Sequence, residues 1–241
     1  MNQNKLLRML INSSKLGCSY VLPLWEKLGS TANDVYLGGT VRDASYVGNP
    51  TLGVPTANPR IPFMCQFVDG SYVAPNAAHS LANGYRIGFL VALDVVSTGT
   101  KQQIIFESTE ADATEDRFSL YLDETNHLVL QMRNVAGQTI TTVTSTDAIS
   151  AGIHILHVLV SLPTTKSVTF YLDGAVLTST GTLNFTTAAI GAAAYPLAHR
   201  FGRYTDAEPR RYLGGLGFVV KYTIILTPKI ILNQAKAGGV A

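Results

Sequence analysis

The feature that most constrains the fold is a succession of short segments, from residue 63 onward, rich in Val, Ile, Thr, Phe and Tyr. These residues favour strands, and turn signals such as Asp173-Gly174 separate the segments. No helical rhythm alternates with them, so the pattern predicts an all-β, antiparallel two-sheet sandwich or jelly roll. The predicted strands are residues 63–68, 85–96, 102–108, 117–123, 127–133, 138–145, 153–162, 167–174, 198–203 and 216–225.

The two ends of the chain carry helical patterns. Apolar residues recur at helical spacing in NKLLRMLINSSKL, and we expect residues 1–16 to form a short N-terminal arm. The arm packs on its own domain or docks on a neighbouring subunit, and both alternatives stay open. Near the other end, Thr227 fits an N-cap, Pro228 the first helical position and Gly238 the stop, which predicts a short C-terminal helix.

Residues 29–62 are rich in Gly, Pro, Asn and Thr, which predicts a long irregular stretch. It either wraps a sheet face or contacts another molecule. We see no linker and no second core in the 241 residues. The expected organisation is therefore an arm at 1–16 and a single sandwich domain at 17–241.

Charge and cysteine content limit the kinds of partner. The chain has 18 Lys and Arg against 16 Asp and Glu, a net charge of +2, which argues against a nucleic-acid binder. No apolar run is long enough for a membrane span, and no signal peptide is evident. Cys18 and Cys65 are too few for a disulfide framework: two buried thiols are favoured, and one bridge stays open.

Several phrases occur in the order found in the concanavalin A-like lectin/glucanase superfamily, in its laminin G-like form. FVDGSYVAP (67–75) is similar to an early strand of that family, and VTFYLDGAVLTST (168–180) to its Asp-Gly hairpin. RFGRY and YLGGLGFVVKYTIILTPKII (200–231) resemble its ending, and LWEKLGSTANDVYLGG (24–39) its opening. The resemblance implies a concanavalin A-like jelly roll over roughly residues 20–238.

This superfamily includes lectins, glycanases, adhesion modules and virus-particle proteins, so the resemblance leaves function open. The composition is similar to that of tailed-phage particle proteins. We therefore expect a non-enzymatic virion protein, a capsid decoration or tail component, made in the host cytoplasm. Its partners would be other virion proteins and further copies bound through the arm. The alternative is a carbohydrate-binding or receptor-binding module, and a weaker one is a glycoside hydrolase.

One acidic stretch, ESTEADATED (107–116), matches the Glu-x-Asp-x-x-Glu motif of related glucanases through Glu110, Asp112 and Glu115. In those enzymes the motif supplies a nucleophile and an acid/base. Here Ala and Thr separate the acids, which is typical of a polar hairpin tip, so we predict no catalytic residues. No cofactor is expected, although these three carboxylates could hold calcium. Further loop candidates for calcium are Asn33, Asp34, Asp43, Asp69 and Asp206, each of which more simply forms a turn.

A stretch of Tyr and Arg gives the predicted contact surface for a sugar or a protein. Tyr has an apolar ring and a polar tip, and Arg can stack or pair with carboxylates. Trp25, the only tryptophan, is expected in the core. The predicted contact residues are Tyr195, Arg200, Arg203, Tyr204, Arg210, Arg211 and Tyr212.

Overall fold

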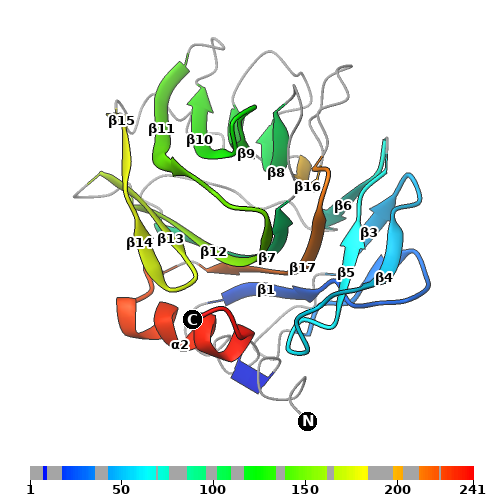
Figure 1. Ribbon diagram of the computed structural model, residues 1–241. Helices are drawn as coiled ribbons and strands as arrows, with labels where there is room; N and C mark the ends of the chain where they lie inside the picture. Colours follow the sequence, from blue (N-terminus) through cyan, green and yellow to red (C-terminus); the bar gives the residue numbers. More distant parts are fainter. Residues whose placement is uncertain are drawn as a thin grey trace.

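Two antiparallel β-sheets stack face to face in the computed structural model, and one short helix, α2 (Pro228–Gly238), lies against the outside of one of them (Figure 1). This confirms the predicted all-β, two-sheet sandwich with a C-terminal helix. The structure describes residues 8–9, 18–35, 43–68, 70–75, 86–95, 102–109, 117–133, 139–161, 166–183, 198–202, 212–222 and 224–241.

Sheet A carries α2 on its outer face. Its strand β12 lies between β13 and β7, as its apolar run IHILHVLVSL predicts for a central strand. β1 (Cys18–Pro23) pairs with one part of β17, and β5 with another. In order, the sheet is β14 (Ala175–Leu177), β13 (Ser167–Leu172), β12 (Gly152–Ser161), β7 (Arg86–Val95), β17 (Gly215–Tyr222), β5 (Phe63–Gln66) and β4 (Thr51–Pro55).

Sheet B forms the opposite layer. Its strands β8 to β11 follow one another as a meander, and β16, β6, β3 and β2 extend the sheet. In order, it contains β15 (Ser179–Leu183), β11 (Thr139–Ala148), β10 (His127–Arg133), β9 (Arg117–Leu122), β8 (Gln103–Thr109), β16 (Ala198–Phe201), β6 (Tyr72–Pro75), β3 (Ala44–Val47) and β2 (Thr31–Ala32).

Strand alternation divides the side chains of sheet A between two environments. On β7, Val91 and Leu93 enter the core between the sheets, where they join residues of sheet B such as Phe106. Ala92 belongs instead to a second apolar cluster, on the outer face of sheet A. Sheet A therefore packs on both faces.

Helix α2 covers part of that outer face. Ile231 is fully buried in the second cluster, together with Ile155 of β12 and Phe218 of β17. Burying one such side chain stabilises the docked helix by roughly 1.5–3 kcal/mol. Gly238 lets the helix approach closely, since a Cβ there would stand 1.9 Å from the Cδ1 atom of Ile155. The helix ends at Gly238, as predicted, and Gly239, whose φ of 79° is left-handed, caps it.

A buried polar chain also joins α2 to sheet A. The His157 Nε2–H of β12 donates to Gln234 Oε1 of α2 at 2.8 Å, and Gln234 Nε2 donates to the Tyr222 hydroxyl at 2.7 Å. Burial lowers the pKa of His157 to about 4. His157 is therefore neutral at pH 7, and its Nδ1 atom has no hydrogen-bond partner in the described structure.

The predicted irregular stretch, residues 29–62, is wrong in part because it contains the three short strands β2, β3 and β4. These strands were not predicted because each has at most five residues and has Gly or Pro within it or within two positions of it. The Asp173-Gly174 turn is confirmed: both residues have positive φ and close the β13–β14 hairpin.

Residues 1–16 were predicted to form an arm. Of these, Arg8 and Met9 belong to the described residues; they are helical, and Met9 packs against the outer cluster of sheet A. The division into an arm and a domain at 17–241 stays a prediction. Cys65 is a free, buried thiol whose pKa is raised to about 12, first by burial and then by Glu26, so it is not bridged to Cys18. In the described part of the chain we find no helix that could span a membrane.

We predict that His157 makes the protein sensitive to acid. Its pKa is lowered from 6.5 to about 4 in the folded state, so below pH 6.5 the unfolded chain binds this proton first. His157 therefore removes up to about 3 kcal/mol of stability as the pH falls from 6.5 to 4. Urea unfolding at both pH values should show that loss in the wild type and its absence in His157→Gln. His127→Gln, on sheet B, is the matched control; it keeps His157 and should lose as much stability as the wild type. Equal losses in all three proteins would contradict the prediction.

Candidate functional site

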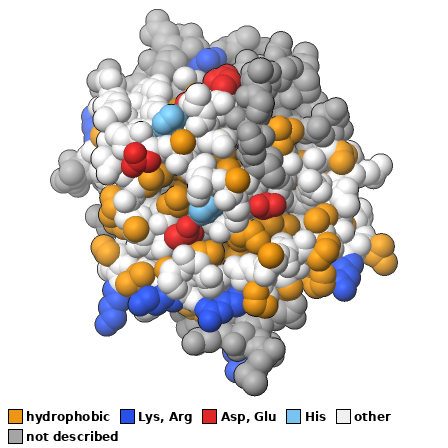
Figure 2. All heavy atoms as spheres, viewed as in Figure 1, with side chains coloured by type: hydrophobic (Ala, Val, Ile, Leu, Met, Phe, Trp, Pro, Cys, Tyr) orange, Lys and Arg blue, Asp and Glu red, His pale blue; other side chains and the backbone are white. Residues whose placement is uncertain are grey.

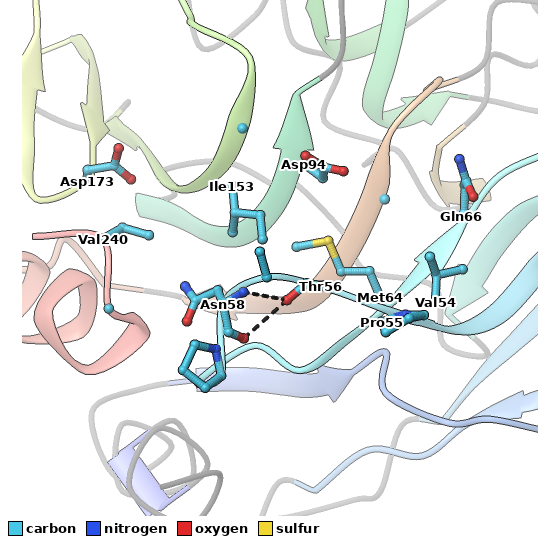
Figure 3. A pocket seen from close by; sticks show the side chains of 15 residues that line it. Val54, Pro55, Thr56, Asn58, Met64, Gln66, Asp94, Ile153, Asp173 and Val240 are labelled. Carbon is cyan, nitrogen blue, oxygen red and sulfur yellow. Dashed lines mark hydrogen bonds between the residues drawn. The ribbon is translucent and has the colours of Figure 1, made fainter.

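An open pocket of about 680 Å³ lies on the outer face of sheet A, where several of its strands begin or end. Figure 3 shows it extending from Asp173 and Val240 at one end to Gln66 and Val54 at the other. The lining comes from the ends of β5, β7 and β13, the starts of β12 and β17, the β4–β5 loop and the chain after α2. The residues are Val54, Pro55, Thr56, Ala57, Asn58, Pro59, Met64, Gln66, Asp94, Gly152, Ile153, Asp173, Gly215, Gly239 and Val240.

Asp94 supplies a carboxylate to the middle of the pocket. It is the last outward-facing residue of β7, two positions after Ala92 of the outer cluster. Burial raises the pKa of Asp94, and nearby His154 lowers it in part. Within the described part of the chain, its side chain accepts no hydrogen bond. A half-buried carboxylate of this kind gains from a ligand that donates hydrogen bonds.

The pocket also offers an amide, from Gln66, and an apolar wall. Gln66 is exposed at the end of β5, and its amide has no hydrogen-bond partner among the described residues. Met64 lies on the same face of β5 and faces Ile153 across the pocket (Figure 3). An amide and a carboxylate beside an apolar wall can hold a molecule that has both hydroxyl groups and C–H faces.

Glycines at the start of β17 keep this part of the pocket open. A Cβ on Gly214 would stand 1.8 Å from the backbone oxygen of Asp94. A Cβ on Gly215 would stand 2.9 Å from Cβ of Met64. Glycines in a strand permit such a close approach of neighbouring backbone and side chains.

Asn58 and Thr56 shape the β4–β5 side of the pocket. Asn58 Nδ2 donates to Gly238 O at 2.7 Å, which ties the loop to the end of α2. Asn58 Oδ1 accepts from Arg60 N, and Thr56 Oγ1 accepts from Asn58 N and donates to Ile61 O. These two side chains are engaged within the protein, so they fix the rim.

A histidine and a carboxylate form an ion pair beside the pocket. His154 Nδ1 donates to Asp173 Oδ2 at 2.6 Å, and its Nε2 lies 3.0 Å from Ser150 O. Asp173 Oδ1 accepts from Ile155 N at 2.8 Å. The hydrogen bond with Asp173 is the main cause that raises the pKa of His154, against the opposing effect of burial. Both ring nitrogens face acceptors, so the protonated imidazolium is favoured.

The charge of the pocket is therefore anionic. The fifteen lining residues include two carboxylates and no Lys, Arg or His. His154 balances Asp173, which leaves the Asp94 carboxylate as the dominant charge. In the same view as Figure 1, Figure 2 shows acidic and histidine side chains lying among hydrophobic ones on this face.

Of the seven residues of the predicted Tyr and Arg contact surface, Arg200 and Tyr212 belong to the described part of the chain. Arg200 is half-buried on β16 and stacks on Tyr72 of β6, 4.9 Å from its ring centroid. Tyr212 is fully buried, and its hydroxyl donates to Asp94 O at 2.9 Å. The prediction is corrected there, because Tyr212 supports the backbone under the pocket and is not exposed to a partner. Five predicted residues lie outside the described part: Tyr195, Arg203, Tyr204, Arg210 and Arg211.

The predicted calcium ligands Glu110, Asp112 and Glu115 also lie outside the described residues, as do Asp69 and Asp206. Elsewhere, Asp34 Oδ1 accepts from Val21 N, and Asp43 Oδ1 accepts from Asp34 N. These two carboxylates fasten a loop to β1, which is a structural role. The described residues contain no group of three or more His, Cys, Asp or Glu side chains that could hold a metal.

Sequence reasoning missed the pocket itself. Asp94 and Gln66 lie two residues before the ends of the predicted strands 85–96 and 63–68. Positions near strand ends are a signal, since neighbouring strand ends meet at one edge of a sheet. The partners of each strand were unknown, so nothing placed the two side chains in one cavity. Trp25 was predicted in the core; it is partly buried and packs against the outer cluster of sheet A.

Comparison with known proteins gives the fold only. No protein-family model and no curated protein matches the chain. A Trypanosoma rangeli sialidase, in complex with 2,3-difluorosialic acid as a covalent intermediate, matches with a TM-score of 0.63 at 15% identity over 91% of this chain. A botulinum neurotoxin serotype D/C binding domain matches with a TM-score of 0.65 at 10% identity over 94%. Botulinum neurotoxin type C, which depends on two ganglioside molecules to enter cells, matches with a TM-score of 0.63 at 10% identity over 94% of this chain.

This chain spans 32% of the sialidase chain and 53% and 52% of the two neurotoxin chains. The prediction that the protein is not an enzyme is corrected by this comparison, because sialidases are among its structural neighbours. The resemblance to one fold could not separate binding proteins from enzymes, since both are built on it. The predicted lectin-like sandwich is consistent with these neighbours.

We predict that Asp173→Asn lowers the pKa of His154. Asparagine also tolerates the left-handed φ of 52° at this position, so the turn should persist. The main cause that raises the pKa is the hydrogen bond with the Asp173 carboxylate, and Asp94 contributes least among the causes. NMR titration of the histidine side chains should therefore show a larger fall for Asp173→Asn than for Asp94→Asn. An unchanged titration of His154 in Asp173→Asn would contradict the ion pair.

Proposed function

We propose that the protein is a lectin-like module that binds an uncharged glycan in the pocket on sheet A. The observation that carries the proposal is the Asp94 carboxylate, half-buried and without a hydrogen-bond partner among the described residues, in an open cavity with Gln66 and an apolar wall. Sugar hydroxyls donate to a carboxylate, and an amide both donates and accepts. Met64, Val54 and Ile153 give the C–H faces of a sugar ring an apolar contact.

The charge of the pocket argues for an uncharged ligand. A sugar acid would bring its carboxylate toward Asp94, and no Lys or Arg among the lining residues would offset the repulsion. The elongated cavity in Figure 3 also suits more than one sugar unit. Hydroxyl groups along such a chain could reach Asp94 and Gln66 together.

The structural neighbours support this class of ligand without specifying it. Two of these neighbours are a protein bound to a sialic acid derivative and a protein that depends on gangliosides for cell entry. Those ligands belong to those proteins. They show that the sandwich occurs in glycan-recognising proteins, and the choice of an uncharged glycan here rests on the pocket.

The prediction of a phage virion protein gains no support from the comparisons and stays a prediction. So do its expected partners, its location in the particle and association through the arm. A glycan-binding module is compatible with such a setting, and the pocket gives no preference for it.

A glycan array at pH 7 tests the proposal, with neutral and sialylated glycans, in calcium and in EDTA. We expect binding to neutral glycans, weakened at least about tenfold by Asp94→Asn because a charged hydrogen bond contributes about 1.5–3 kcal/mol. Gln66→Ala should weaken it further. Selective binding to sialylated glycans, or none to any glycan, would overturn the proposal. Loss of binding in EDTA would implicate Glu110, Asp112 and Glu115.

Two control variants locate the site. Asp147→Asn makes the same chemical change at an exposed position on β11 and should leave affinity unchanged. Arg200→Ala alters the predicted Tyr and Arg surface on the other sheet. If Arg200→Ala abolishes binding while Asp94→Asn does not, the glycan binds at that surface and the pocket assignment is wrong.

A further inference from the structure

On one side of the sandwich, each of the two sheets ends in a strand that has a single neighbour among the described strands. β15 ends sheet B and β14 ends sheet A, and the two strands follow each other in the chain through Thr178. Figure 1 shows them together at the left of the molecule, above α2. β15 pairs with β11 on one side, and no described strand pairs with its other side. In the part of the chain that the structure describes, its outward backbone N–H and C=O groups thus have no strand partner, and such an edge can pair with another strand.

The sequence of this edge lacks the charged residues and prolines that normally prevent a strand edge from pairing with another chain. Residues 175–183 read AVLTSTGTL, with no charged residue and no proline. None of them is buried, and seven of the nine residues, including Thr180, Gly181 and Thr182, are exposed. Soluble proteins usually protect such an edge with Lys, Pro or a covering segment.

Exposed apolar side chains accompany the edge. Val176 on β14 is 63% exposed, Leu183 on β15 is 37% exposed, and Leu232 on α2 is 38% exposed. Leu232 contacts the turn that leads into β14, since a Cβ on Gly174 would stand 3.1 Å from its Cδ1 atom. Three of the five exposed large hydrophobic side chains in the described residues thus follow this side of the molecule. Unpaired backbone and apolar contacts favour a protein partner.

We propose that β15 pairs antiparallel with β15 of a second copy of this chain, so that two sheets B join across a two-fold axis. The strand is self-complementary about Gly181: antiparallel pairing there brings Thr180 opposite Thr182 of the partner. A second copy fits better than a charged partner, because the edge offers no charge to attract one. Isologous contacts of this kind are the common route to dimers.

The register of sheet B supports this pairing. Thr180 already pairs with Thr144 of β11, and Thr182 with Thr142. The two-fold would therefore continue the cross-strand Thr pairs over four strands, which is a favourable arrangement in sheets. Gly181 cannot be replaced easily, since a Cβ there would stand 2.0 Å from Thr142 O. Thr180 and Thr182 are exposed, so larger polar side chains fit there without disturbing the core.

A charge design tests the interface by analytical ultracentrifugation of the full chain. Wild type should sediment as a dimer that dissociates on dilution. Thr180→Lys with Thr182→Lys would set lysines against each other across the two-fold, and this variant should be monomeric. Thr180→Lys with Thr182→Glu would set opposite charges across it, so the dimer should return and weaken in high salt.

Each outcome decides the question. Circular dichroism and thermal melts of both variants establish that they fold. A wild type that stays monomeric at the highest soluble concentration overturns the proposal. So does a folded Lys/Lys variant that dimerises as strongly as the wild type, because the contact would then lie elsewhere, as on the N-terminal arm. The result is independent of glycan binding, since none of the altered residues lines the pocket.

Discussion

The requirement that sheet A bury both of its faces organises the rest of the structure. Its inner face packs against sheet B, and its central strands also carry apolar residues outward, as Ile155 and Phe218 show. That outer surface would be costly in water, so α2 and the neighbouring segments have to cover it. The helix is held there by Ile231, by the close approach at Gly238 and by the His157–Gln234–Tyr222 chain.

The pocket exists because this cover is incomplete. Beyond α2 the strands β5 and β7 end and β17 begins, and the residues at the ends of β5 and β7 change from apolar to polar, at Gln66 and Asp94. Glycines at 214 and 215 and the fixed β4–β5 loop keep a hollow open between them. The polar side chains of the pocket thus lie where the strands no longer have to pack against a covering layer. Sites on β-sandwiches are commonly found there, because loops and strand ends are free to vary in sequence.

The sequence was informative wherever a pattern is local. Strand periodicity, the Asp173-Gly174 turn and the Thr227-Pro228 helix start predicted the sandwich, a hairpin and α2. It was uninformative where the outcome depends on which strands become neighbours. Asp94 and Gln66 are 28 residues apart, and Tyr212 appeared to belong to a surface but supports Asp94 from inside the core. A run of Tyr and Arg shows what a segment could contact, and only tertiary packing decides which residues remain accessible.

The two proposals reinforce each other physically although they rest on different residues. A single open pocket that offers a ligand the Asp94 carboxylate and the Gln66 amide makes few strong contacts, so its affinity for a glycan is modest. Two copies joined at β15 would hold two pockets at a fixed separation, and a polymeric or clustered glycan could engage both. The second contact then forms at a high effective concentration, which raises the apparent affinity without any new contact in the pocket. A rigid sheet-to-sheet junction keeps that separation constant, so binding should favour glycan surfaces whose spacing matches it.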